Sequence, residues 1–75
     1  MKKKITNTAE FRRWVKIEVA SQESSMAALA RKMQVPQARI SEAIHGKSAG
    51  NKYIIPIIRE LGGDMADFDE FLKVI

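Results

Sequence analysis

The residues best placed to do chemistry in this 75-residue chain form a short series between positions 37 and 45. In a helix, side chains advance by about 100° per residue, so this stretch divides into two faces. Ile40, Ala43 and Ile44 share one face. The other face carries side chains able to hydrogen bond, together with one methyl group: Ala38, Ser41, Glu42 and His45, with Gln37 and Arg39 at the flanks. This set favours recognition of a ligand by hydrogen bonding.

The same residues do not predict catalysis. The chain shows no nucleophile beside a base and no carboxylate pair in a predictable cleft, so we expect no catalytic residues and no enzyme activity. There is no cysteine, and His45 is the only histidine, so we expect neither a metal site nor a cofactor. Gly46-Lys47-Ser48 lacks the glycine that a phosphate-binding loop needs five residues before Gly46, because Ser41 stands there.

Composition predicts one folded unit. Hydrophobic residues make up 45% of the chain and charged residues 29%, which is the balance of a globular domain. The absence of cysteine suits a reducing, cytoplasmic setting. Apolar runs such as 54–58 are far shorter than the ~20 residues that span a bilayer, so we expect no membrane segment.

Charge is distributed unevenly along the chain. Residues 1–52 carry 11 Lys or Arg against 4 Asp or Glu, whereas residues 53–75 carry 2 against 5. A basic part beside an acidic part suits a polyanion bound on one side only. The alternative is that these charges merely keep a small domain in solution.

Hydrophobic spacing predicts an all-α fold, a compact bundle of about five short helices. The first spans about 8–21, with Asn7 and Glu10 resembling a capping box. The second is about two turns long and follows Ser24 or Ser25 as cap. After a corner at 34–35, a third helix with Pro36 at its first position runs to about His45. A loop over 47–51 precedes a fourth helix from about 52 or 53, and a fifth begins after residue 64.

Within these elements, the most specific residues are Leu29-Ala30, Met33, Val35, Ile40-Ser41, Gly46-Lys47 and Leu61-Gly62. These residues and the order of the elements resemble the lambda-repressor-like helix-turn-helix domains of the Cro and repressor type. The match covers about 24–71, with the motif at about 25–46, and the length is similar to that of small phage Cro- or Ner-type regulators. In that family the second helix of the motif enters the DNA major groove.

The resemblance implies a partner, double-stranded DNA, and roles for individual residues. Gln pairs with adenine, Ala packs on a thymine methyl and Glu accepts from cytosine. Base edges would be contacted by Gln37, Ala38, Ser41 and Glu42. Phosphates would be contacted by Arg39, His45, Lys47, Asn51 and Lys52.

Three positions depart from the family pattern. Gln34 stands where the family usually has a glycine before the valine of the corner. Met26 replaces the polar residue that often begins the second helix and holds a phosphate. Glu42 is an acid on a face expected to meet a polyanion, so it is either a specific reader or an argument against DNA binding by this face.

Both ends of the chain leave two interpretations open. Lys2, Lys3 and Lys4, within a predicted flexible arm of residues 1–6 ahead of a domain at 7–75, could wrap DNA or simply be solvated. Trp14 could be a core residue or a surface anchor. We expect the apolar stripe near the carboxyl end to contribute both to the core and to a homodimer surface at Phe68, Phe71, Leu72 and Ile75.

The sequence therefore predicts a DNA-binding transcriptional regulator, of the phage or prophage repressor kind, that binds a palindromic operator as a dimer. Two alternatives use the same fold. One is a protein-interaction module, such as an antitoxin or a host-factor-binding protein. The other is a nonspecific nucleic-acid binder, which the lysine-rich start permits.

Overall fold

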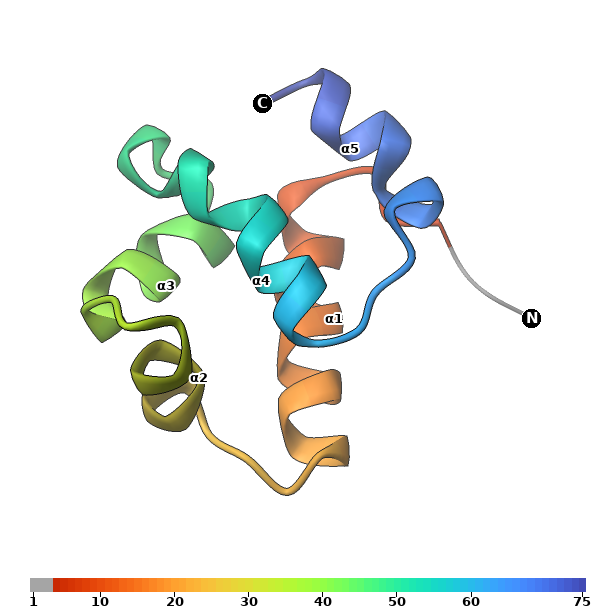
Figure 1. Ribbon diagram of the computed structural model, residues 1–75. Helices are drawn as coiled ribbons and strands as arrows, with labels where there is room; N and C mark the ends of the chain where they lie inside the picture. Colours follow the sequence, from red (N-terminus) through yellow and green to blue (C-terminus); the bar gives the residue numbers. More distant parts are fainter. Residues whose placement is uncertain (1–3) are drawn as a thin grey trace.

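The computed structural model describes residues 4–75, and Figure 1 shows their arrangement as a compact bundle of short helices. None of these residues lies in a β-strand, so the predicted all-α bundle of about five helices is confirmed. The α-helices are α1 (Thr8–Ser21), α2 (Met26–Met33), α3 (Gln37–Ile44), α4 (Ile54–Glu60) and α5 (Asp69–Lys73), and the 3-10 helices are η1 (Ser48–Tyr53) and η2 (Met65–Phe68).

Helix α1 has the bounds that the sequence predicts, and its first turn explains why. The Asn7 side chain accepts a hydrogen bond from the Glu10 amide at 2.9 Å, which satisfies one of the free donors of the first turn. The Glu10 carboxylate accepts bonds from both the amide and the hydroxyl of Thr6, each at 2.8 Å. Together, the hydrogen bonds made by Asn7 and by Glu10 fix the residue at which α1 begins.

One apolar cluster holds the helices together. Phe11 of α1 is fully buried and meets the rings of Phe68 and Phe71, with centroids 6.1 and 5.1 Å away. Trp14 is half-buried at the edge of this cluster, with its ring edge-on to Phe68 at 4.7 Å. Every α-helix contributes buried side chains to the cluster.

The apolar stripe near the carboxyl end is predicted to serve both the core and a dimer surface, and its core role is confirmed at Phe68 and Phe71, which keep almost no surface for a second copy. Phe68 and Phe71 are each only 1% exposed, because they pack against α1 within the same chain. Leu72 is half-buried against the core. Ile75 is exposed, as is Val74, which the prediction did not include.

The predicted arm of residues 1–6 is too long at its carboxyl end. The Ile5 side chain is buried, and its amide donates a hydrogen bond to the Asp67 carbonyl at 2.8 Å, so the chain before α1 lies against η2. Thr6 is bonded to α1 as described above. Lys4 is exposed, while Lys2 and Lys3 lie outside the described residues.

The segments around α4 and α5 differ from the prediction in detail. The expected loop over 47–51 is mostly the 3-10 helix η1, and α4 begins at Ile54, so Pro56 falls in its first turn, where proline is tolerated. Pro36 is the cap of α3 and not its first helical residue. The expected fifth helix opens with η2, whose first turn is capped by the Asp64 carboxylate accepting from the Ala66 amide at 3.0 Å.

No helix within residues 4–75 has the length and apolar character needed to cross a membrane.

The packing of α3 can be tested with two isoleucines. Ile40 is fully buried, so Ile40→Asp places a charge in an apolar cluster and is expected to unfold the domain, since native stability is only about 5–15 kcal/mol. Ile55 is 41% exposed in the first turn of α4, where an acid is favourable, so Ile55→Asp is the matched control and keeps the fold. Thermal melts followed by circular dichroism measure both. A native melt for Ile40→Asp contradicts the packing described here.

Candidate nucleic-acid interface

The corner between α2 and α3 is built by local backbone contacts. Ser25 caps α2 by accepting from the Ala28 amide at 3.0 Å. After Met33, Gln34 adopts the left-handed conformation with φ of 60°. The amides of Gln34 and Val35 then donate back to the carbonyls of Arg31 and Ala30. Three residues therefore suffice to turn the chain from α2 into α3.

Gln34 holds a backbone conformation that is costly for a residue with a side chain. A residue with a side chain at positive φ is disfavoured by roughly 1–2 kcal/mol relative to the right-handed region. Glycine, which has no Cβ, would avoid that cost. Here the bonds that close the end of α2 hold a glutamine in the same conformation.

Helix α3 presents a polar edge to solvent. Ile40, Ala43 and Ile44 are buried in the core, which fixes the rotation of the helix. Gln37, Ala38 and Ser41 are consequently exposed. The structure therefore brings three of the four predicted base-contacting residues together on one accessible surface.

The fourth predicted residue, Glu42, is engaged by its own helix. An oxygen of its carboxylate lies 2.7 Å from Nη1 of Arg39, one turn earlier, so the two side chains form a hydrogen-bonded ion pair. This bond and the negative charge of Glu42 raise the pKa of Arg39. Sequence reasoning assigned the two residues to different sets and missed the pair, although the three-residue spacing is one at which opposite charges meet on a helix.

His45 closes the carboxyl end of α3. Its Nδ1 lies 2.8 Å from the Ser41 carbonyl oxygen, and since a carbonyl only accepts, Nδ1 carries the proton in this contact. Only Nε2 is then left to meet a ligand. A neutral ring presents a lone pair at Nε2, so contact with a phosphate oxygen needs the charged form of the ring.

Gly50 fixes η1 against α3, and no sequence signal singled it out. A Cβ at Gly50 would lie 2.2 Å from the Ala43 nitrogen and 2.6 Å from the Glu42 carbonyl carbon, so the backbones of η1 and α3 are in direct contact. Gly50 is buried, whereas Lys52, two residues on, is exposed. This contact sets the position of the predicted phosphate-binding residues relative to the polar edge of α3.

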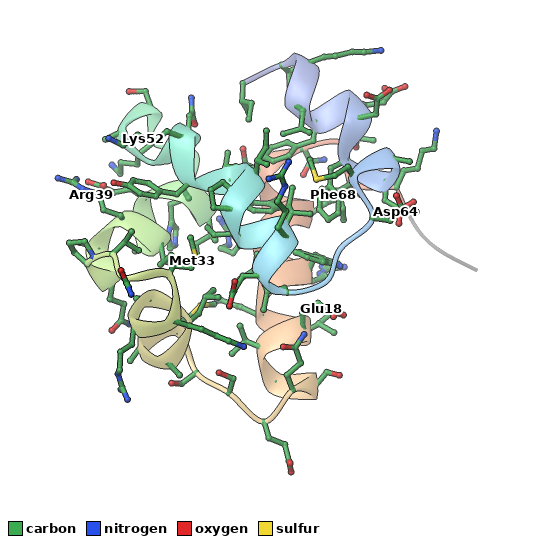
Figure 2. All side chains as sticks on the ribbon, viewed as in Figure 1. Glu18, Met33, Arg39, Lys52, Asp64 and Phe68 are labelled. Carbon is green, nitrogen blue, oxygen red and sulfur yellow. The ribbon has the colours of Figure 1, made fainter. Side chains whose placement is uncertain are left out.

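The predicted phosphate-binding residues surround that contact. Lys47 is exposed directly before η1, and Asn51 is half-buried within it. The Lys52 ammonium lies 5.3 Å from the centre of the Tyr53 ring, within the range of a cation–π contact. Figure 2 shows Lys52 and Arg39 on the same side of the molecule and Asp64 on the opposite side. Asp64 therefore lies apart from these two basic residues, whereas Arg13 lines the same groove as Asp64 and Lys32 pairs with Glu60 at 3.6 Å.

A groove of about 400 Å³, called the α1 groove, lies between α1 and the segment that follows α4. Trp14 and the 56%-exposed Ile17 form its apolar wall. A Cβ at Gly63 would come within 2.9 Å of two Trp14 ring atoms, so this glycine lets the chain after α4 close on the indole. Arg13, Glu18 and Asp67 are among the charged residues at its rim. Trp14 therefore joins the core and also faces a surface groove.

Within the described part of the chain, no three His, Cys, Asp or Glu side chains gather as a metal site would require. Comparisons with protein-family models, with curated proteins and with solved structures find no match to this chain.

The Gly50 contact predicts different costs for two glycine substitutions. Gly50→Ala forces two backbones apart and is expected to destabilise the domain by about 3 kcal/mol. Gly62→Ala is the control, because its φ of 79° strains any side chain by about 1–2 kcal/mol while nothing lies within 4 Å of the new Cβ. Urea denaturation gives both free energies of unfolding. Equal losses for the two variants contradict the direct contact of η1 and α3.

Proposed function

We propose that this protein is a sequence-specific DNA-binding transcriptional regulator of the phage-repressor kind. The observation that carries the proposal is the exposed polar edge of α3, held at a fixed distance from the basic residues around η1 by the backbone contact at Gly50. A short corner before α3 leaves this edge free to enter a groove of DNA, as in helix-turn-helix proteins.

The two sets of residues have different tasks in this proposal. Gln37 and Ser41 offer hydrogen bonds to base edges, and the Ala38 methyl suits the methyl group of thymine. Lys47, Asn51 and Lys52 contact phosphates, which position the protein but carry no sequence information. Because much of the affinity then comes from phosphates, binding weakens steeply as salt rises.

We further propose that two copies bind a palindromic operator. A single α3 covers only a few base pairs, and dimers of helix-turn-helix proteins contact half-sites about 34 Å apart. With Phe68 and Phe71 in the core, the apolar residues left for a second copy at the carboxyl end are Leu72, Val74 and Ile75. This surface is smaller than the one predicted from the sequence.

Selection from a pool of random duplexes tests the function and the dimer together. The protein is incubated with the pool at ~150 mM salt, and the retained duplexes are sequenced, since the ratio of specific to nonspecific affinity identifies a regulator. We expect one enriched motif with two-fold symmetry. An enriched motif without symmetry contradicts the dimer, and equal retention of all duplexes contradicts sequence-specific binding and supports a nonspecific binder.

Single substitutions separate phosphate contacts from base contacts. Lys47→Ala and Lys52→Ala are each expected to weaken binding to every duplex alike and to reduce the slope of log K against log salt by about 1. Gln37→Ala is expected to relax the preference at one position of the motif. Arg13→Ala removes the same charge from the α1 groove and is the control that leaves DNA affinity unchanged. Fluorescence anisotropy at several salt concentrations measures all four variants.

A second candidate function, a protein-interaction module, is favoured by the α1 groove. Its wall of Trp14 and Ile17 is apolar and accessible, and it lies away from the polar edge of α3. Stoichiometric co-purification of one identified protein, abolished by Ile17→Asp and retained by Gln37→Ala, would favour this function over the first.

A further inference from the structure

We infer that Arg39 recognises a guanine in the bound DNA, and that Glu42 positions Arg39 and does not read a base itself. This inference rests on the proposed DNA-binding function and names the base that one residue of α3 contacts. It reverses the roles that the family resemblance implies, in which Glu42 reads a base and Arg39 contacts phosphate.

The geometry of the pair limits what Glu42 can do. Its carboxylate is bonded to Arg39 at 2.7 Å, and only 29% of its side chain is exposed, against 44% for Arg39. The bond to Arg39 uses one carboxylate oxygen and leaves the other able to accept, but a carboxylate that turned away from the guanidinium to reach cytosine would stand as a free negative charge among phosphates. Remaining in the pair avoids that repulsion, because the pair brings no net charge to the DNA.

The same pair prepares Arg39 for a planar ligand. A guanidinium has five N–H donors in a rigid fork, and one bond to Glu42 leaves the others available while restricting the orientation of the plane. Guanine offers two acceptors, N7 and O6, at the spacing that such a fork contacts with two bonds. A guanidinium whose plane is already fixed therefore loses less conformational freedom on binding guanine than one that rotates freely.

The position of Arg39 also favours a base over a phosphate. It is the third residue of α3, and in helix-turn-helix proteins the residues near the start of the recognition helix contact base edges. Lys47 and Lys52, which are compact charges without a fork, suffice for the phosphates nearby.

The test is a double-substitution cycle on duplexes taken from the selection described above. Binding constants are measured for the selected duplex and for its single-base variants with wild type, Arg39→Ala, Glu42→Gln and the double variant. Circular dichroism confirms that each variant is folded. The quantity compared is the preference for guanine over adenine at each motif position.

We expect the wild type to prefer guanine by roughly 10- to 100-fold at one position in each half-site. Arg39→Ala abolishes that preference, Glu42→Gln reduces it to a few-fold at the same position, and the double variant equals Arg39→Ala. Arg39→Lys keeps the charge and much of the total affinity but loses the guanine preference, because lysine has no fork. Arg13→Ala removes an arginine from the α1 groove, so it is the matched control and leaves the guanine preference unchanged.

Three results overturn the inference. A change of preference at a different, cytosine-containing position in Glu42→Gln makes Glu42 a base reader. An equal loss of affinity for all duplexes in Arg39→Ala makes Arg39 a phosphate contact. Selection of no motif by the wild type removes the proposed function and this inference with it, whereas a selected motif with additive effects of the two substitutions removes the inference alone.

A measurement without DNA checks the pair directly. In nitrogen-15 NMR spectra, the guanidinium protons of Arg39 are expected to exchange with water more slowly than those of the other arginines in the wild type. In Glu42→Gln this difference is expected to disappear. Equal exchange of all arginines in the wild type contradicts the fixed orientation on which the inference depends.

Discussion

A single apolar cluster, shared by all five α-helices, is the constraint on which the rest of this structure depends. Helices of five to eight residues, which include every α-helix except α1, are marginal in water by themselves. Their orientation is therefore decided by what they bury and not by their own propensity. Burial of Ile40 and Ile44 turns the polar side of α3 outward, so the proposed recognition surface is a consequence of core packing.

The sequence predicts those parts of the fold whose signals are local. The bounds of α1 follow from a capping residue and a regular apolar spacing, both within one helix, and the structure has the same bounds. Spacing alone cannot tell which molecule supplies the opposite surface, so Phe68 and Phe71 were assigned both to the core and to a dimer surface, although α1 of the same chain covers them. The burial of Ile5 was missed for a related reason, because its hydrogen-bond partner is 62 residues further along the chain, at Asp67.

The candidate site shows the same division. Exposure of Gln37, Ala38 and Ser41 follows from the helical period once Ile40 is known to be buried. The ion pair of Arg39 and Glu42 is a local feature with a spacing that the sequence shows. It was not predicted because the family resemblance gave each residue a separate role. Gly50 could not be recognised in advance, because a glycine in a polar stretch looks like a flexible loop until the helix that it contacts is placed.

The contact at Gly50 has a mechanical consequence. Because the backbones of η1 and α3 touch, the two elements are packed as one body, and neither backbone can come closer to the other to suit a different groove. If this body binds a duplex, the adjustment in groove width and twist falls on the DNA, and sequences that deform easily to that spacing are preferred at positions the protein never touches. Gly50 would then contribute to the choice of DNA sequence through the shape of the duplex, without any hydrogen bond to a base.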